Sequence, residues 1–305
     1  MSKIAFIFPG QGAQTCGMGK AFYDSNPESA AVFELAEQVT GLPIKQLCFE
    51  PNEKLNITEF TQVCLLTAEL AILKAVEGCG ITPHVTAGLS LGEYAALCAA
   101  HRLETRDAIN IVRWRGKFMQ EAVPRGGAMS AVLGLDKETV EDVCRQIDGI
   151  VSPANYNCPG QLVISGEEAA VEKAGIMLKN AGAKRVAPLK VSGPFHSQML
   201  KGAGEQLEKI LENVCFLSSD IPYVCNTGAV YVEDTESIRD ILIRQVSSPV
   251  RWEQSVRQMI DRGVDTFIEI GPGKTLCGFL KRIDRTVTGI NVETPEDLKK
   301  LEVLC

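Results

Sequence analysis

The run Val85-Thr-Ala-Gly-Leu-Ser-Leu-Gly-Glu-Tyr94 joins a strand-like segment, residues 85–87, to a helix-forming segment, residues 93–100. Its centre, Gly88-Leu-Ser-Leu-Gly92, matches the G-x-S-x-G nucleophile elbow. A serine at such a sharp turn points its hydroxyl outward, and the flanking glycines remove β-carbons that would clash. The N–H groups at the start of the following helix then face any developing oxyanion. A chance match in an ordinary loop is the alternative, but the small residues of 93–100 favour a buried elbow with Ser90 as nucleophile.

Length and composition exclude several protein classes. A chain of 305 residues predicts about two domains, or one domain with a large insertion, and 45% hydrophobic with 23% charged residues is typical of a globular protein. No apolar run approaches the ~20 residues of a membrane span. The net charge of −7 argues against general nucleic-acid binding. The short apolar run 3–8 passes into a Pro-Gly loop, which indicates a first strand rather than a signal peptide.

Cysteine usage indicates a reducing compartment. The chain has 11 cysteines, an odd number, with no C-x-x-C pair and no zinc-ligand spacing. We therefore expect reduced thiols in a cytoplasmic protein and no metal site.

The segments before the elbow predict a buried strand, a ligand-facing loop and two helices. Residues 3–8 read as a strand buried on both faces. The glycine-rich loop 9–14 cannot be a Rossmann turn, because Thr15 stands where the third glycine belongs. It is better suited to offering backbone N–H groups to a ligand. Residues 18–40 and 58–79 have helical periodicity.

A charged residue interrupts the apolar face of the next predicted helix, residues 104–123. Arg115 occupies the stripe formed otherwise by residues such as Ile111, Val112 and Met119. A buried guanidinium needs a partner. One alternative is that the side chain reaches the surface or pairs with a structural carboxylate. The other is that the guanidinium points into a pocket and binds a ligand carboxylate through two parallel hydrogen bonds.

A second domain is predicted after the break at residues 124–127. Its expected order is β-α-β-β-α-β, which is the ferredoxin-like arrangement. The segments are strand 128–135, helix 137–147, strands 150–155 and 162–165 with a turn at 157–160 between them, helix 167–181 and strand 185–191.

His196 follows a Gly-Pro turn where this inserted domain should rejoin the main one. Loops at such junctions line clefts, so His196 is the candidate base. His84 and His101, the other two histidines, have loop-like surroundings that predict surface positions.

The last third returns to alternating strands and helices. We expect a strand over 221–226, a helix over 236–245, a loop over 246–252, a helix over 253–262, a strand over 266–270 and a final strand over 287–292. The run Gly273-Lys274-Thr275 is not a P-loop, because Ile268 stands where that motif requires a glycine.

Six segments in register carry a family resemblance. They are residues 8–14, 88–94, 115–120, 154–161, 193–197 and 269–274. Together they closely resemble the malonyl-CoA:acyl-carrier-protein transacylases of bacterial fatty-acid synthesis, along the whole chain. One departure is Leu89, where many relatives have histidine.

The resemblance implies an α/β fold: an α/β-hydrolase-like large domain with an inserted ferredoxin-like small domain. The large domain would comprise residues 1–125 and 197–305, and the small domain residues 126–196.

The resemblance also implies roles for residues. Ser90 would be the nucleophile and His196 the base, with backbone N–H groups of Gln11 and Leu91 forming the oxyanion hole. Arg115 would bind the substrate carboxylate. Further residues implied at the substrate site are Gln245, whose carbonyl would orient the histidine, together with Asn155, Asn157 and Phe195.

The implied reaction moves a malonyl group from malonyl-CoA to acyl carrier protein, with no metal or other cofactor, in a monomeric enzyme. No nucleic-acid or membrane partner is expected. Because acyl carrier protein is acidic, a local basic patch should receive it. The candidates are Lys274, Lys281, Arg282 and Arg285; an ordinary solvated helix face is the alternative.

Three other functions share part of this pattern. A serine hydrolase or thioesterase shares the elbow, but its histidine would lie near the C-terminus and Arg115 would be unexplained. A non-catalytic module that binds carrier protein has no need of Ser90, His196 and Arg115 together. A stand-alone polyketide acyltransferase would have nearly the same chemistry.

Overall fold

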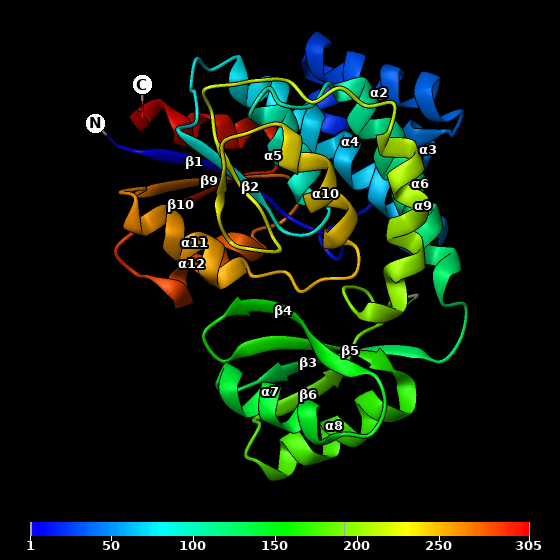
Figure 1. The fold of residues 1–305 in the computed structure, drawn as a ribbon. Helices are drawn as coiled ribbons and strands as arrows, with labels where there is room; N and C mark the ends of the chain where they lie inside the picture. Colours follow the sequence, from blue (N-terminus) through cyan, green and yellow to red (C-terminus); the bar gives the residue numbers. More distant parts are fainter. Residues whose placement is uncertain (1, 192, 305) are drawn as a thin grey trace.

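A computed structural model describes residues 2–191 and 193–304 of the chain. It has a six-stranded sheet surrounded by helices and, below it, a four-stranded sheet with two helices of its own (Figure 1).

The helices are α1 (Lys20–Ser25), α2 (Pro27–Thr40), α3 (Ile44–Phe49), α4 (Thr58–Glu77), α5 (Gly92–Ala99), α6 (Thr105–Ala122), α7 (Lys137–Gln146), α8 (Glu168–Asn180), α9 (Lys201–Leu211), α10 (Glu236–Gln245), α11 (Trp252–Asp261) and α12 (Thr275–Ile283), with short 3-10 segments η1 (Lys54–Asn56), η2 (Gln198–Leu200) and η3 (Pro295–Leu304). The strands are β1 (Ile4–Phe8), β2 (Val85–Gly88), β3 (Gly127–Leu133), β4 (Val151–Cys158), β5 (Gln161–Glu167), β6 (Arg185–Pro188), β7 (Tyr223–Val224), β8 (Tyr231–Val232), β9 (Thr266–Ile270) and β10 (Thr288–Val292).

The large sheet is mostly parallel, in the order β10-β9-β1-β2-β7-β8. Only β8 runs antiparallel, against β7. Because β1, β2 and β9 are parallel, their carboxyl ends meet at one edge of the sheet. Ligands of open α/β sheets bind at this edge. The loop after β1, the elbow after β2 and the turn after β9 are therefore brought together there.

Strand β1 is buried on both faces, as its continuous apolar sequence predicts. Phe6 and Phe8 belong to one core, with residues of α4, α5 and α6. Ala5 and Ile7 belong to a second core, with residues of α11 and α12. The sheet is thus covered by helices on both faces, a mixed α/β arrangement.

The smaller sheet is antiparallel, in the order β4-β5-β3-β6. Alternate residues of β3 face opposite sides: Val132 packs with α7 and α8, whereas Met129 and Ala131 line a cleft toward the large sheet. The order of elements in residues 127–188 follows the sequence prediction, with strands extended or shortened at their ends.

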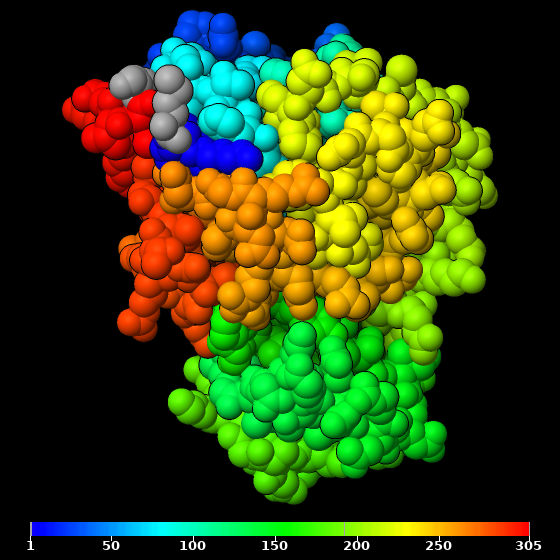
Figure 2. All heavy atoms as spheres, turned by 60° about the vertical axis from the view of Figure 1, so that its left-hand side comes forward, coloured from blue at the N-terminus to red at the C-terminus, as the bar shows by residue number. Residues whose placement is uncertain are grey.

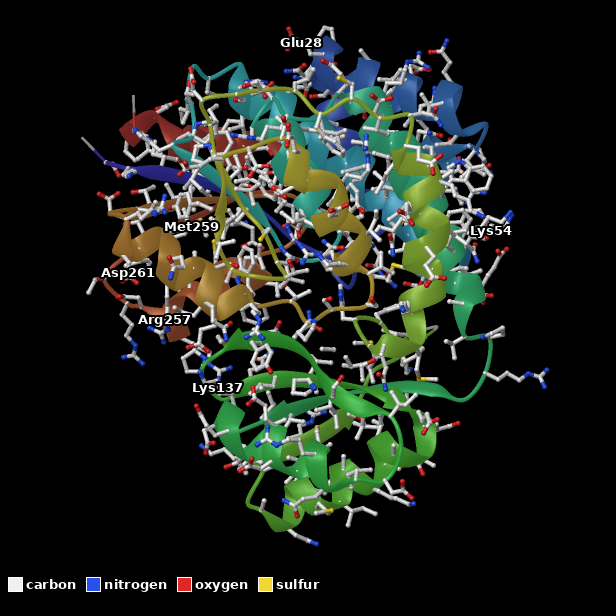
Figure 3. The ribbon with its side chains drawn as sticks, in the orientation of Figure 1. Glu28, Lys54, Lys137, Arg257, Met259 and Asp261 are labelled. Atoms are coloured by element: carbon white, nitrogen blue, oxygen red, sulfur yellow. The ribbon has the colours of Figure 1, made fainter. Side chains whose placement is uncertain are left out.

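The edge strand β4 attaches the small sheet to the rest of the chain. Val250 forms an isolated parallel bridge with Asn155, through bonds from Val250 N to Ala154 O (2.8 Å) and from Tyr156 N to Val250 O (2.9 Å). In Figure 2 the small sheet and its helices form a bulge that meets the segment around residues 250–285. A crevice follows this junction between α7, which carries Lys137, and α11, which carries Arg257 (Figure 3).

Several predicted boundaries were wrong. The helix predicted over 18–40 is split into α1 and α2, because Pro27 starts a new helix and the Asn26 side chain caps it by accepting from Ser29 N. The turn predicted at 157–160 is limited to 159–160, since β4 continues through Cys158. The strand predicted over 221–226 is only Tyr223–Val224.

Some elements were not predicted at all, namely α3, α9, β8 and the 3-10 segments, and α12 was anticipated only as the solvated helix face that is the alternative to a carrier-protein patch. Across residues 2–191 and 193–304, none of the helices combines the length and the apolar character that spanning a membrane requires.

Candidate active site

Ser90 lies in a strained turn between β2 and α5. Its φ is 55°, in the left-handed region that non-glycine residues rarely adopt. A β-carbon at Gly88 would lie 1.9 Å from the backbone of Gly92, and one at Gly92 would lie 2.3 Å from Phe8 O. Neither position has room for a β-carbon, because the backbone of another segment lies too close. This explains why the elbow pattern has glycine at both positions.

The Ser90 hydroxyl lies beside the imidazole of His196, a residue 106 positions further along the chain. His196 Nε2 is 2.7 Å from Ser90 Oγ. His196 Nδ1 faces two backbone carbonyl oxygens, Gln245 O at 2.9 Å and Ser248 O at 3.1 Å. Because carbonyls only accept, Nδ1 carries the proton and Nε2 is left to accept from the serine.

The environment keeps this imidazole neutral. His196 is buried, and burial together with the nearby charge of Arg115 lowers its pKa to about 4, against the opposing effect of the two carbonyls. A neutral imidazole at physiological pH is the form that can accept the serine proton.

Arg115 reaches the same place from the buried stripe of α6. Its Nη1 donates to Gln62 Oε1 at 2.6 Å, and its Nη2 donates to Gln245 Oε1 at 2.8 Å and to Ser90 Oγ at 3.3 Å. The guanidinium also lies over the Tyr94 ring, 5.5 Å from its centroid.

None of the salt bridges in the described part of the chain involves Arg115, and its Nε has no acceptor there. The cation is therefore buried without a paired carboxylate, which leaves it donor capacity and charge for an anionic ligand.

These groups open onto a cavity of about 280 Å³ between the two sheets. The loop after β1, the elbow, His196, Arg115 and the cleft-facing side of the small sheet line it. Gln11 and Leu91 both line this cavity, and neither backbone N–H group has an acceptor within residues 2–191 and 193–304. They are free to donate to an oxygen beside Ser90.

The remaining candidates divide into two groups. Asn155, Asn157 and Phe195 line the cavity, and the Oδ1 atom of Asn157 has no partner among the described residues. Gln245 does not line the cavity. The residue is fully buried and accepts hydrogen bonds from Arg115 through its side chain and from His196 through its backbone carbonyl. Its position suits support of the site rather than direct substrate contact.

The four basic candidates for carrier-protein contact are all exposed on or near α12. These four side chains differ in their contacts. Arg282 donates to Gln161 Oε1 and to Pro159 O, both at 2.7 Å, and so ties α12 to the small sheet. Helix α12 is itself held by Glu269, which accepts from the N–H groups of Leu276 (2.9 Å) and Cys277 (2.7 Å).

Three buried polar residues of the site were not predicted from the sequence. Gln62 interrupts the apolar sequence of α4, and Glu93 interrupts the small residues of α5, so each left a signal in the pattern. Asn226 lies in a turn after β7, and nothing in the sequence pattern marks it as a residue of the site. His84 and His101 are exposed, as predicted.

No group of three or more His, Cys, Asp or Glu side chains suited to a metal was found among residues 2–191 and 193–304.

Comparison with known proteins gives a consistent result. Residues 5–294 match the acyl transferase domain family. The malonyl CoA-acyl carrier protein transacylase of Bacillus subtilis is 46% identical over 304 residues, covering 98% of this chain and 96% of the relative.

Solved structures agree. The acyl carrier protein S-malonyltransferase of Vibrio cholerae superposes with a TM-score of 0.95 at 42% identity, covering 98% of this chain and 100% of that one. A malonyl-transacylase in complex with its type II PKS acyl-carrier protein also gives 0.95, at 41% identity and 98% coverage of both chains.

Proposed function

The chain belongs to the acyl transferase domain family, and on that basis we propose that it moves a malonyl group from malonyl-CoA to the phosphopantetheine thiol of acyl carrier protein. The observation that carries the proposal is the meeting of three groups: His196 Nε2 and Arg115 Nη2 both lie within hydrogen-bond distance of Ser90 Oγ. This arrangement combines an activated nucleophile with a buried cation for the distal carboxylate that distinguishes malonyl from acetyl.

In the first half-reaction His196 Nε2 takes the proton of Ser90, and Oγ attacks the thioester carbonyl of malonyl-CoA. The N–H groups of Gln11 and Leu91 donate to the resulting oxyanion, a contribution of ~3–4 kcal/mol per donor in comparable sites. The carbon–sulfur bond then breaks, and His196 returns the proton to the departing thiolate of coenzyme A. The product is an ester of malonate on Ser90.

In the second half-reaction the carrier thiol gives its proton to His196 and attacks that ester. The oxyanion forms again on the same two N–H groups, the carbon–oxygen bond breaks, and Ser90 is reprotonated. Arg115 holds the malonyl carboxylate throughout. All of these steps use amino-acid side chains and backbone amides, so we propose that no metal or other cofactor takes part.

We also propose the finer fold description: an α/β-hydrolase-like domain of residues 1–125 and 197–305 with a ferredoxin-like domain, residues 126–196, inserted. The central parallel strands supported by helices on both faces, and the strand order β4-β5-β3-β6, support it. The monomeric state and the cytoplasmic location expected from the sequence stay predictions.

Covalent labelling tests the function. Wild-type protein incubated with radiolabelled malonyl-CoA should carry label that holo-carrier protein then removes, whereas Ser90→Ala should carry none. Ser25→Ala, an exposed serine on α1, is the matched control and should label normally. Label that persists in Ser90→Ala would refute the nucleophile assignment.

The same experiment separates the alternatives. A hydrolase would release free malonate without carrier protein, and a non-catalytic binding module would not label at all. The similarity to the polyketide-associated transacylase makes the identity of the carrier a separate question. Comparing transfer rates to fatty-acid and polyketide carrier proteins answers it.

A further inference from the structure

A single carboxylate oxygen of Glu93, three residues after the nucleophile, receives two hydrogen bonds. Glu93, in the first turn of α5, is fully buried. Its Oε2 accepts from Gln245 Nε2 at 2.9 Å and from the backbone N of Asn226 at 3.2 Å. Its Oε1 has no partner in the described part of the chain. A buried carboxyl is costly unless its hydrogen bonds serve the structure or the site.

Both of these partners hold the backbone of Ser90. Asn226 Oδ1 accepts from Ser90 N at 2.6 Å, and Asn226 Nδ2 donates to Gly88 O at 2.6 Å. On the other side, Gln245 Nε2 donates to Ser90 O at 2.7 Å. Two side-chain amides therefore grip the N–H and the C=O of a residue in a strained conformation.

The carboxylate also decides which way the Gln245 amide points. An amide can place either its oxygen or its nitrogen toward a given neighbour. Because Glu93 Oε2 and Ser90 O are acceptors, Nε2 must face them, and Oε1 must face the guanidinium of Arg115. The backbone carbonyl of the same glutamine accepts from His196 Nδ1.

We propose that Glu93 is a positioning residue for acyl transfer: it fixes Asn226 and Gln245, which hold the Ser90 elbow, and through Gln245 it orients Arg115. Glu93 touches neither substrate nor the reacting atoms. The inference rests on the proposed function, because it assigns Glu93 to the same nucleophile and carboxylate clamp.

Burial raises the pKa of Glu93 to about 7, opposed by its hydrogen bonds with Gln245 and Asn226 and by the charge of Arg115. Since both donors point to Oε2, the proton of the neutral form belongs on Oε1. Glu93 can thus act as acceptor in either protonation state. The variant Glu93→Gln presents its amide oxygen to the same donors, and its amide N–H groups take the place of Oε1, which has no described partner. Those N–H groups lower the free energy of unfolding, but Asn226 and Gln245 keep their acceptor, so the acylation rate per folded molecule should change little.

Three variants test the proposal. Glu93→Gln keeps an acceptor, Glu93→Asp keeps the charge but is too short to reach both donors, and Glu93→Leu leaves both donors unpaired. An unpaired buried donor costs a factor of about 10 to 100 in an equilibrium or rate. We expect Ser90 acylation by malonyl-CoA to fall about 10- to 100-fold in Glu93→Asp and Glu93→Leu, and less than about threefold in Glu93→Gln.

The readouts separate positioning from simple stability. Rates are measured per folded molecule, with circular dichroism giving the folded fraction. A fluorophosphonate probe reports the Ser90–His196 pair without bringing a carboxylate to Arg115, and the ratio of malonyl to acetyl acylation reports the carboxylate binding by Arg115. Glu93→Asp should slow the probe and also lower the ratio. The control is Glu69→Gln, a fully buried carboxyl whose oxygens have no described partner; both readouts should stay at the wild-type value.

Normal rates in folded Glu93→Asp would overturn the proposal, as would a Glu93→Gln variant as slow as Glu93→Asp. If Glu93→Leu does not fold, the comparison of the other two still decides. Wild-type protein that fails to react with the probe would instead refute the proposed function, so the two failures can be told apart.

Discussion

Arg115 donates a hydrogen bond of 3.3 Å from Nη2 to the hydroxyl of Ser90. The cation and the nucleophile are thus close enough to contact the two ends of one short acyl group. An acyl chain that is bonded to Ser90 Oγ at one end can place a carboxylate on Arg115 only if few atoms separate the two. Malonyl, with one carbon between its carbonyl and its carboxylate, meets this condition.

Removing the cation should change the choice of substrate. Arg115→Met keeps much of the volume but loses the charge, and loss of a charged hydrogen-bonded contact costs about 1.5–3 kcal/mol. We expect malonyl acylation of Ser90 to fall about 10- to 150-fold, with acetyl acylation nearly unchanged. Mass spectrometry of the protein after exposure to malonyl-CoA, methylmalonyl-CoA and acetyl-CoA measures the ratio.

Arg113→Met is the matched control, because Arg113 is on the same helix but pairs with Glu59 at 2.7 Å. It should retain the wild-type preference. Equal losses for malonyl and acetyl in Arg115→Met would contradict a carboxylate clamp.

The low pKa of His196 predicts activity far into the acid range. With a pKa of about 4, the imidazole stays neutral and basic well below pH 6.5, where an unperturbed histidine would be half protonated. The acylation rate constant kcat/KM should therefore stay level from about pH 8 to 5 and fall only below that. A fall centred near 6.5 would contradict the pKa. A step near 7 that vanishes in Glu93→Gln would belong to Glu93 instead.

The lowered pKa of His196 should also make the free energy of unfolding depend on pH. Between pH 6.5 and about 4 the unfolded chain binds a proton at residue 196 that the folded chain does not, so the free energy of unfolding decreases as the pH falls through this window. The contribution is roughly 3 kcal/mol over the window. Urea unfolding at several pH values should show a smaller acid loss for His196→Gln than for wild type.

Much of the fold could be predicted from the pattern of residues, but glycine-rich helices could not. The buried strands β1 and β9 were predicted within one or two residues because each is a short, mostly apolar run buried throughout, and the helix α6 because its apolar stripe has helical periodicity. Helix α9 was missed because Gly202 and Gly204 lower its helix propensity. Gly204 is explained only by the tertiary structure, where its Cα faces the backbone of α10 and a β-carbon would meet Ile243 O at 2.9 Å.

The site was predictable where one residue carries the chemistry. Ser90 is marked by its glycines, and Arg115 by its place on an apolar stripe. Asn226 could not be found, because nothing in its local sequence shows that the fold places its amide on Ser90 N. The contact spans 136 positions along the chain, and only pairing of β2 with β7 brings them together.

The basic candidates near α12 should separate into two roles. Lys281 is exposed and has no ion pair in the described part of the chain, so Lys281→Glu should raise the KM for carrier protein about 3- to 10-fold and leave the KM for malonyl-CoA unchanged. Arg282→Glu should raise both constants, because Arg282 also donates to Pro159 O and to the side chain of Gln161, and Gln161 lines the cleft. Steady-state kinetics with each substrate varied in turn measures this.

Lys179→Glu, the same charge reversal on the distant helix α8, is the control and should change neither constant (Figure 1). If it raises the KM for carrier protein as much as Lys281→Glu does, net charge and not a local patch controls carrier binding.

The elbow should not tolerate one methyl group at Gly92. A β-carbon there would lie 2.3 Å from Phe8 O and 2.6 Å from Pro9 O, and both atoms belong to backbone that cannot rotate away. Gly92→Ala must therefore push α5 from the end of β1, moving Ser90 relative to the N–H of Gln11. We expect a loss of about 3 kcal/mol in the free energy of unfolding and a loss of Ser90 acylation in the protein that still folds.

Gly202→Ala is the opposite case and the control. Nothing lies within 4 Å of a β-carbon at Gly202, and the residue is in the first turn of α9. Alanine there should stabilise the protein by about 0.5–1 kcal/mol, since it reduces the freedom of the unfolded chain without strain. Thermal and urea unfolding of the two variants, with acylation rates per folded molecule, make the comparison. A Gly92→Ala protein as stable and as active as Gly202→Ala would mean that the helix can shift without disturbing the elbow, and that the close approach of α5 to β1 is not what sets the position of Ser90.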